Sequence, residues 1–168
     1  QAQTAFEIGD IKVKPFRLSH DAAEPVGYSF CKGDKQITIV TDTGYISEEV
    51  FDQIKDADLL VLEANHEVNI LKMGAYPYSL KRRILGDEGH LSNEAAGKCL
   101  CDMLKYRGLQ KKADVPKVVL AHLSKENNTP GQAYLTIRNI LFEEDYYIDR
   151  DLELDIALRE EVGKNVEI

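Results

Sequence analysis

Three apolar, β-like runs of this chain each stop just before a residue that can bind a metal ion. Those residues are His20, Asp42 and His122. Sheet-based α/β folds collect their ligands just beyond strand ends, so we expect the three side chains to share one crevice. Two imidazoles and a carboxylate suit a divalent cation such as zinc or manganese. The pattern predicts a metal site built from these residues and favours metal-assisted hydrolysis.

A fourth apolar run, residues 58–62, leads into Glu63 and His66. For His66 two interpretations stay open. It can act catalytically, by protonating a leaving group or orienting a ligand. It can equally be a helix cap, or a core histidine satisfied by Glu63. Asp42 also has an alternative, since a carboxylate in Thr-Asp-Thr-Gly can simply hydrogen-bond its own turn. Its assignment as a catalytic metal ligand depends on the whole set.

Four further residues are candidates for substrate binding: His90, Ser92, Lys125 and Asn127. The first two precede a predicted helix, and the other two lie between His122 and the start of another helix. Helix starts offer free backbone amides to phosphate groups, and Lys125 adds a positive charge. Ordinary capping and turn chemistry explains the same residues equally well.

The composition describes one domain of 168 residues with a net charge of −8. This charge argues against holding nucleic acid by bulk electrostatics, although bound divalent cations would offset part of it in a nuclease. Basic residues cluster at 81–83 and 105–112, where solvated helix faces are the favoured interpretation. The Tyr76-Pro77-Tyr78 segment can stack on bases, but packing is the more usual role of such residues.

The compartment is inferred from cysteine use and from hydropathy. The three cysteines form no CxxC pattern, which argues against a disulfide framework or a zinc ribbon and fits a reducing cytoplasm. No apolar run is long enough to cross a bilayer, so we expect no membrane partner.

Periodicity and turn signals predict a layered α/β (α+β) domain. Strands are expected at 5–18, 28–33, 35–40, 58–62, 117–121 and 146–148, with a tight Gly33-Asp34 hairpin joining the second and third. Helices are expected at 47–54, 67–72, 78–85, 93–107 and 130–142.

The segments LSHDAAEPVGYSF, VTDTGY, LLVLEANHE, GHLSN and VLAHLSKENNTP resemble metallo-β-lactamase-fold hydrolases. The resemblance runs from about residue 6 to the C-terminus and looks closest to the YycJ/WalJ-type bacterial subfamily, which is associated with exonuclease activity on DNA. It implies a four-layer αβ/βα sandwich with two divalent metal ions at one edge. His20 then matches the third metal-binding motif, Asp42 the bridging carboxylate of the fourth, and His122 the fifth.

One departure from the family pattern shapes the expectation for this chain. The His-x-His-x-Asp-His signature of such enzymes is absent, and all four histidines are isolated. The resemblance therefore implies that residues 1–168 are the C-terminal portion of a single domain whose N-terminal half is missing. On that interpretation the chain alone can lack metal, and it self-associates or pairs with the missing portion.

The function that these observations predict is a dinuclear metallohydrolase that cleaves phosphodiester bonds, with DNA as its substrate. One alternative is a hydrolase of small phosphodiesters or thioesters on the same fold. Another, of a different class, is a non-catalytic structural or interaction module with an incomplete metal site.

Overall fold

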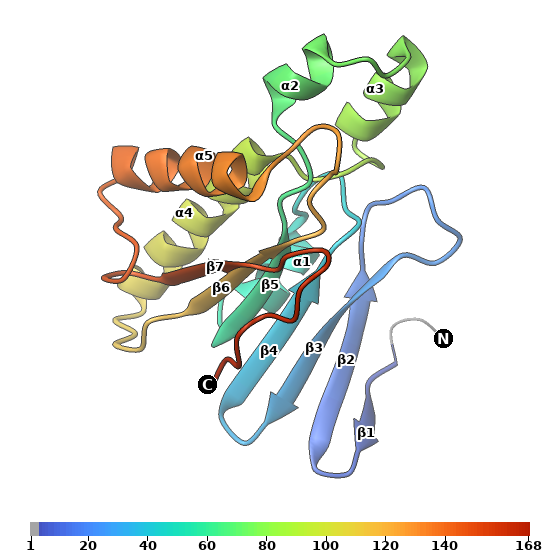
Figure 1. Cartoon of the computed structure of the whole chain (residues 1–168). Helices are drawn as coiled ribbons and strands as arrows, with labels where there is room; N and C mark the ends of the chain where they lie inside the picture. Colours follow the sequence, from blue (N-terminus) through green and yellow to red (C-terminus); the bar gives the residue numbers. More distant parts are fainter. Residues whose placement is uncertain (1–3) are drawn as a thin grey trace.

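The computed structural model describes residues 4–168, which form one mixed sheet of seven strands in sequence order (Figure 1). The first four strands pair antiparallel, and the last four, β4 to β7, pair parallel. The strands are β1 (Phe6–Ile8), β2 (Ile11–Arg17), β3 (Val26–Lys32), β4 (Lys35–Val40), β5 (Leu59–Glu63), β6 (Lys117–Ala121) and β7 (Glu153–Ile156).

Tight turns built on glycine connect the antiparallel strands. Gly33 has a φ of 61° and closes the predicted hairpin between β3 and β4, because this left-handed conformation suits glycine best. Gly9 adopts the same φ of 61°. There the chain reverses between β1 and β2, so the single strand predicted over residues 5–18 is wrong and two paired strands replace it.

The parallel half of the sheet determines where chemistry can occur. Val40 pairs with Leu62, and Leu62 pairs with Leu120, so β4, β5 and β6 end at the same edge. These three residues are fully buried at 0% exposure, as expected of strands in the centre of a sheet. The residues that follow the three strands are consequently presented side by side.

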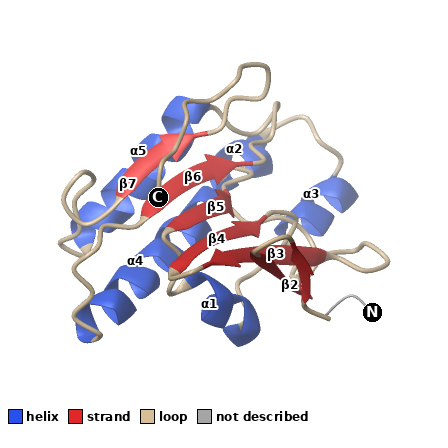
Figure 2. Ribbon diagram, turned by 90° about the horizontal axis from the view of Figure 1, so that it is seen from below, coloured by secondary structure: helices blue, strands red, loops and turns tan. Residues whose placement is uncertain are grey.

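Three helices, α1 (Glu48–Ile54), α4 (Asn93–Leu109) and α5 (Pro130–Glu143), lie along one face of the sheet (Figure 2). Each begins at a hydroxyl cap that accepts a hydrogen bond from a backbone amide, namely Ser47, Ser92 and Thr129. The core lies between this helical layer and the sheet. The result is an α/β layer pair, in agreement with the predicted fold class.

The helices α2 (Val68–Met73) and α3 (Tyr78–Leu85) are placed differently, because they project beyond the carboxyl edge of the parallel strands (Figure 1). Within the described residues no helix combines the length and apolarity needed to span a membrane. All three cysteines are free thiols.

The strand predicted at residues 146–148 is wrong, and β7 occupies Glu153–Ile156 instead. Asp145 and Asp149 have φ values of 63° and 67°, so the chain turns twice where an extended strand was expected. The amide of Tyr147 donates to the Asp151 carboxylate at 2.7 Å and stabilises this turn. The aromatic and β-branched residues of this segment favour a strand, but the turns at the neighbouring aspartates override that preference.

Three loops at the carboxyl edge pack backbone against backbone. The amide of Gly44 donates to the carbonyl of Ser19 at 2.9 Å, and the amide of Asp21 donates to the carbonyl of Glu88 at 3.1 Å. A Cβ added at Gly44 would lie 2.2 Å from the carbonyl oxygen of Asp87. The loops after β2 and β4 and before α4 are thus held together without room for a side chain.

Gly44→Ala should therefore lower the free energy of unfolding by about 2 kcal/mol, because neither backbone segment can move independently to relieve the overlap. Gly108→Ala is the matched control: nothing lies within 4 Å of its added Cβ, and it sits in helix α4. The control should lose no stability, since alanine adopts a helical backbone conformation more readily than glycine does. Urea unfolding measures both values, and equal stability of the two variants would contradict this packing.

Candidate metal centre

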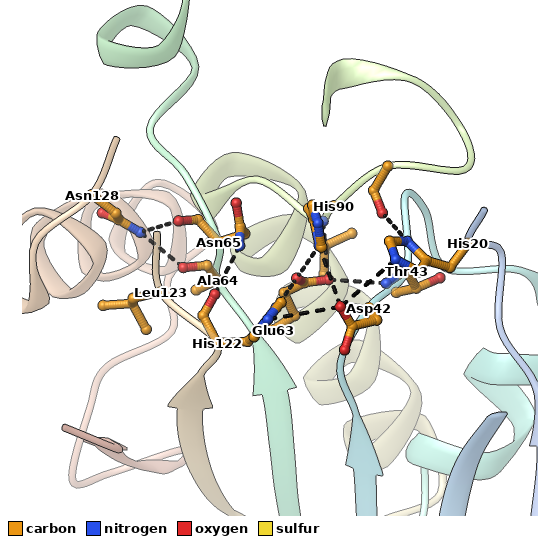
Figure 3. A network of polar contacts seen from close by, with 12 residues as sticks. His20, Asp42, Thr43, Glu63, Ala64, Asn65, His90, His122, Leu123 and Asn128 are labelled. Carbon is orange, nitrogen blue, oxygen red and sulfur yellow. Dashed lines mark hydrogen bonds and ion pairs between the residues drawn. The ribbon is translucent and has the colours of Figure 1, made fainter. Parts of the chain in front are cut away.

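Five polar side chains meet at the carboxyl edge of the parallel strands (Figure 3). Asp42 follows β4, Glu63 ends β5, and His122 follows β6. His20 comes from the loop after β2, and His90 from the loop between α3 and α4. The structure thus brings the three predicted ligands together, and it adds Glu63 and His90 beside them.

Asp42 lies at the centre of this group. Its Oδ1 is 3.8 Å from Nε2 of His20, 3.7 Å from Nδ1 of His90 and 3.7 Å from Nε2 of His122. These separations are too long for hydrogen bonds. They resemble the spacing of neighbouring donors on one cation, which is roughly 3.4 Å for zinc with ligands about 2.1 Å away. The donor set therefore fits a divalent cation of the borderline or harder kind.

Backbone conformation turns two of these side chains back over the sheet edge. Asp42 and His122 have φ values of 65° and 57°, in the left-handed region that is uncommon outside glycine. Such conformations persist where the surrounding structure over-determines them, and they cluster at functional sites. Asn65 contributes to this restraint, since its Nδ2 donates to the carbonyl of His122 at 2.9 Å.

Hydrogen bonds orient the two outer imidazoles. Nδ1 of His20 donates to the carbonyl of Gly89 at 2.9 Å, and Nδ1 of His122 donates to Oε1 of Glu63 at 2.7 Å. With the proton of each ring on Nδ1, the lone pair sits on Nε2, which is the atom that faces Asp42. Metal-binding histidines usually have such a partner on the other ring nitrogen.

Glu63 is fully buried and organises the group. Its Oε1 accepts from Nδ1 of His122 and Nδ1 of His90 at 2.7 and 2.8 Å, while its Oε2 accepts from the amides of Thr43 and Leu91 at 3.0 and 3.2 Å. Burial alone raises the pKa of Glu63, but these hydrogen bonds outweigh it and lower the pKa to about 2. The carboxylate is therefore ionised.

His90 belongs to the centre although its sequence suggested only substrate binding. Its ring centroid lies 4.9 Å from that of His20 and 5.2 Å from that of His122. Asp42, Glu63, His90 and His122 each offer one ligand atom within 4.8 Å of the others. We nevertheless favour His20, Asp42 and His122 as ligands, because both oxygens of Glu63 and Nδ1 of His90 are already hydrogen-bonded.

His66 lies outside this group and is 1% exposed. Neither ring nitrogen has a hydrogen-bond partner among the described residues, and burial lowers the pKa of His66 to about 4. A core histidine at position 66 was expected to hydrogen-bond Glu63. Glu63 instead accepts hydrogen bonds from His90 and His122. The catalytic role expected for His66 stays a prediction.

The remaining candidates differ in their surroundings. Ser92 caps α4 by accepting from the amide of Ala95 at 3.1 Å. Asn127 is 2% exposed, and its backbone and side-chain nitrogens donate to Oγ of Ser124 at 3.2 and 3.4 Å. Lys125 is exposed. Substrate contact stays a prediction for all three. Lys125 is the one charged residue among them, and it is exposed to solvent.

A pocket of about 350 Å³ opens beside the centre, with His90 and His122 in its wall. Three of its lining residues are cations, Arg83, Lys125 and Arg159, and none is Asp or Glu. In a chain of net charge −8 this lining favours an anionic ligand. A groove of about 760 Å³ between α1 and α4 is larger, but it is mainly apolar and contains none of the candidate ligands.

Comparison with known proteins identifies relatives of this chain. The family model for the β-lactamase superfamily domain matches residues 1–110. Exodeoxyribonuclease YycJ of Bacillus anthracis is 39% identical over 146 residues, which are 87% of this chain and 53% of that protein. Exodeoxyribonuclease WalJ of Streptococcus pneumoniae is 42% identical over 146 residues, 87% of this chain and 52% of its own. The chain thus spans about half the length of the curated relatives it matches.

Solved structures share the fold at low identity. The metallo-β-lactamase fold protein YhfI from Bacillus subtilis superposes with a TM-score of 0.61 at 15% identity, covering 94% of this chain and 51% of that one. Zn²⁺-bound PqqB from Methylobacterium extorquens gives a TM-score of 0.56 at 14% identity, covering 94% and 48%. The fold and the sequence matches agree, and the chain belongs to the metallo-β-lactamase superfamily, in its YycJ/WalJ-type branch.

Proposed function

We propose that this chain forms part of a metal-dependent exodeoxyribonuclease that hydrolyses phosphodiester bonds of DNA. The proposal rests chiefly on the position of Asp42, because its Oδ1 lies 3.7–3.8 Å from ring nitrogens of His20, His90 and His122. The names of the YycJ and WalJ relatives support DNA as the substrate. The cation-lined pocket supports it independently, because it suits a phosphate group.

His20, Asp42 and His122 would hold the metal, which we propose to be two divalent ions, zinc or manganese, with Asp42 shared between them. Bound divalent ions would activate a water molecule and stabilise charge on the phosphoryl oxygens. Glu63 keeps Nε2 of His122 free for this role by holding the proton on Nδ1. The carbonyl of Gly89 does the same for His20.

Three protein donors do not complete the coordination of two ions. We therefore propose that residues 1–168 are the C-terminal portion of a single metallo-β-lactamase-like domain, and that the remaining donors come from its other portion. The sheet supports this proposal, because the face opposite α1, α4 and α5 carries the half-buried apolar residues Ile39, Val61 and Val119 without a helical layer of the described residues. Self-association or pairing with that portion stays a prediction.

For proton transfer to the leaving oxygen, the structure supports His90 better than His66. Nδ1 of His90 donates to Glu63, so Nε2 is the atom free to exchange a proton, and the ring lines the pocket. His66 is enclosed by protein, and its lowered pKa keeps it neutral near neutral pH. Lys125 and Arg159 would position the phosphate in the same pocket.

In the protein that includes the other portion of the domain, Asp42→Ala should weaken Zn²⁺ or Mn²⁺ binding by at least about 100-fold, because it removes the donor that faces all three imidazoles. Hydrolysis of end-labelled DNA by the protein carrying the substitution should fall at least as much. Asp87→Ala is the matched control, since that side chain is exposed in the neighbouring loop. Isothermal titration with each metal measures binding, and unchanged affinity in Asp42→Ala would remove Asp42 from the ligand set.

His90→Gln should reduce the turnover of DNA hydrolysis by roughly 10²–10⁴-fold, the usual contribution of a general acid or base. Its metal affinity should stay within a few-fold of the wild type, because Nδ1 of His90 serves Glu63. His66→Gln, measured in parallel, should change turnover far less. The assignment is wrong if His66→Gln loses the turnover and His90→Gln keeps it, which would restore the role predicted for His66.

Stability should fall on acidification partly through His66, whose pKa is about 4 when folded and about 6.5 when unfolded. Below pH 6.5 His66 is protonated in the unfolded chain but stays neutral in the folded chain, so unfolding is favoured as pH falls toward 4. Relative to His66→Leu, the wild type should lose about 2 kcal/mol of unfolding free energy between pH 7 and pH 5. Urea unfolding at both pH values measures this difference, and parallel losses would show that His66 is not buried in the neutral form.

A further inference from the structure

Helices α2 and α3 and the loop between them form a cationic projection, which we call the α2–α3 arm (residues 68–86). The arm contains four cations, Lys72, Lys81, Arg82 and Arg83, and no Asp or Glu. It projects beyond the carboxyl edge of the sheet, on the side where the candidate metal centre lies (Figure 1). Arg83 is paired with Asp21, but the other three cations leave the arm positive on a chain of net charge −8, which favours an anionic partner.

The four cations are not equivalent. Nζ of Lys81 donates to the carbonyls of Lys72 and Gly74 at 2.8 and 2.6 Å, and so fastens α3 to the end of α2. Arg83 forms a two-point ion pair with Asp21 and fastens the arm to the loop after β2. The side chains of Lys72 and Arg82 are exposed and form no ion pair within residues 4–168. Two cations thus fix the shape of the arm, and two are available to a partner.

The arm also carries exposed side chains that can contact bases. Met73 is 88% exposed and Tyr78 is 77% exposed, far more than large apolar groups usually are. Tyr76 lies in the wall of the pocket that contains His90 and His122. Aromatic faces interleaved with cations are the combination with which proteins bind single-stranded nucleic acid.

The arm is continuous with the pocket beside the metal centre. Besides Tyr76, it supplies Leu80, Arg83 and Ile84 to the pocket wall. A strand with one phosphate in this pocket would therefore meet the arm next. Sequence alone favoured a solvated helix face for residues 81–83. Two structural features change this interpretation: the arm forms part of the pocket wall, and it contains no carboxylates.

We propose that the α2–α3 arm binds a single-stranded segment of DNA that flanks the phosphate held beside the metal centre. The inference rests on the proposed function, since it takes DNA as the substrate. Lys72 and Arg82 contact phosphates of this segment, and Tyr76 and Tyr78 stack on its bases. The negative charge elsewhere on the chain disfavours other binding orientations.

The test compares two double variants that each remove two positive charges. Lys72→Gln with Arg82→Gln removes the free cations of the arm. Lys105→Gln with Lys111→Gln removes two exposed cations at and beyond the C-terminal end of α4. Binding is followed by fluorescence anisotropy of a labelled oligothymidylate of about 12 nucleotides over a range of salt concentrations. A chelator is present throughout, so that no hydrolysis occurs.

The arm variant should bind this oligonucleotide roughly 10–100-fold more weakly than the wild type at about 50 mM salt. The slope of log affinity against log salt should fall by about 1.4, or 0.7 for each phosphate that no longer meets a cation. The Lys105 and Lys111 variant should retain wild-type affinity and slope. Circular dichroism melting confirms that both variants are folded.

Equal affinities for the two variants would overturn the proposal, and so would a wild type that does not bind the oligonucleotide. Binding to phosphatidylglycerol vesicles in place of the oligonucleotide would overturn it as well, because the arm would then be a membrane contact. Hydrolysis is measured in a separate experiment, with divalent metal in place of the chelator and on the protein that includes the other portion of the domain. A protein that binds DNA through the arm but hydrolyses no phosphodiester would refute the proposed function and leave the arm intact.

Discussion

The rest of the centre depends on the hydrogen bonds that the buried carboxylate of Glu63 accepts. It is fully buried, so each of its oxygens needs donors, and it receives them from His122, His90, Thr43 and Leu91. These donors belong to three separate segments of the chain, which Glu63 joins to the end of β5. A buried carboxylate that lost even one donor would incur a desolvation penalty of about 1–3 kcal/mol or more. The same bonds that satisfy Glu63 also aim His122 at Asp42.

The loops can hold this arrangement because they are packed through backbone rather than side chains. Gly44 and Gly89 both lie where an added Cβ would approach a neighbouring carbonyl oxygen to 2.2 Å. Such contacts leave little freedom to the segments that carry Asp42 and His90. The left-handed conformations of Asp42 and His122, which are costly in isolation, are thereby maintained. Rigid loops provide the pre-organisation that a metal centre needs.

How much of this could be predicted from sequence depends on the range of the interactions involved. The strand ends and the convergence of the three candidate ligands followed from apolar runs. Parallel pairing brings the carboxyl ends of β4 and β6 to one edge, and two successive antiparallel pairings make β2 run in the same direction. The role of Glu63 could not be predicted, since its bond to His122 spans 59 positions and depends on the register between β5 and β6. The strand expected at 146–148 failed for a local reason, namely the left-handed turns at Asp145 and Asp149.

The distribution of charge shows why composition alone is a weak guide to the partner. A net charge of −8 argued against nucleic acid, yet the pocket beside the centre and the adjoining α2–α3 arm contain cations and no carboxylates. Both basic groups, residues 81–83 and 105–112, form ion pairs: Arg83 pairs with Asp21, and Arg107 and Lys112 pair with Asp114 and Asp56. Only residues 81–83 lie next to the cation-lined pocket, which Arg83 helps to form. Over a screening length of about 8–10 Å, the local sign of the charge decides what a surface attracts. On an acidic chain, a cationic surface restricts the orientations in which a polyanion can bind, because the rest of the surface repels it.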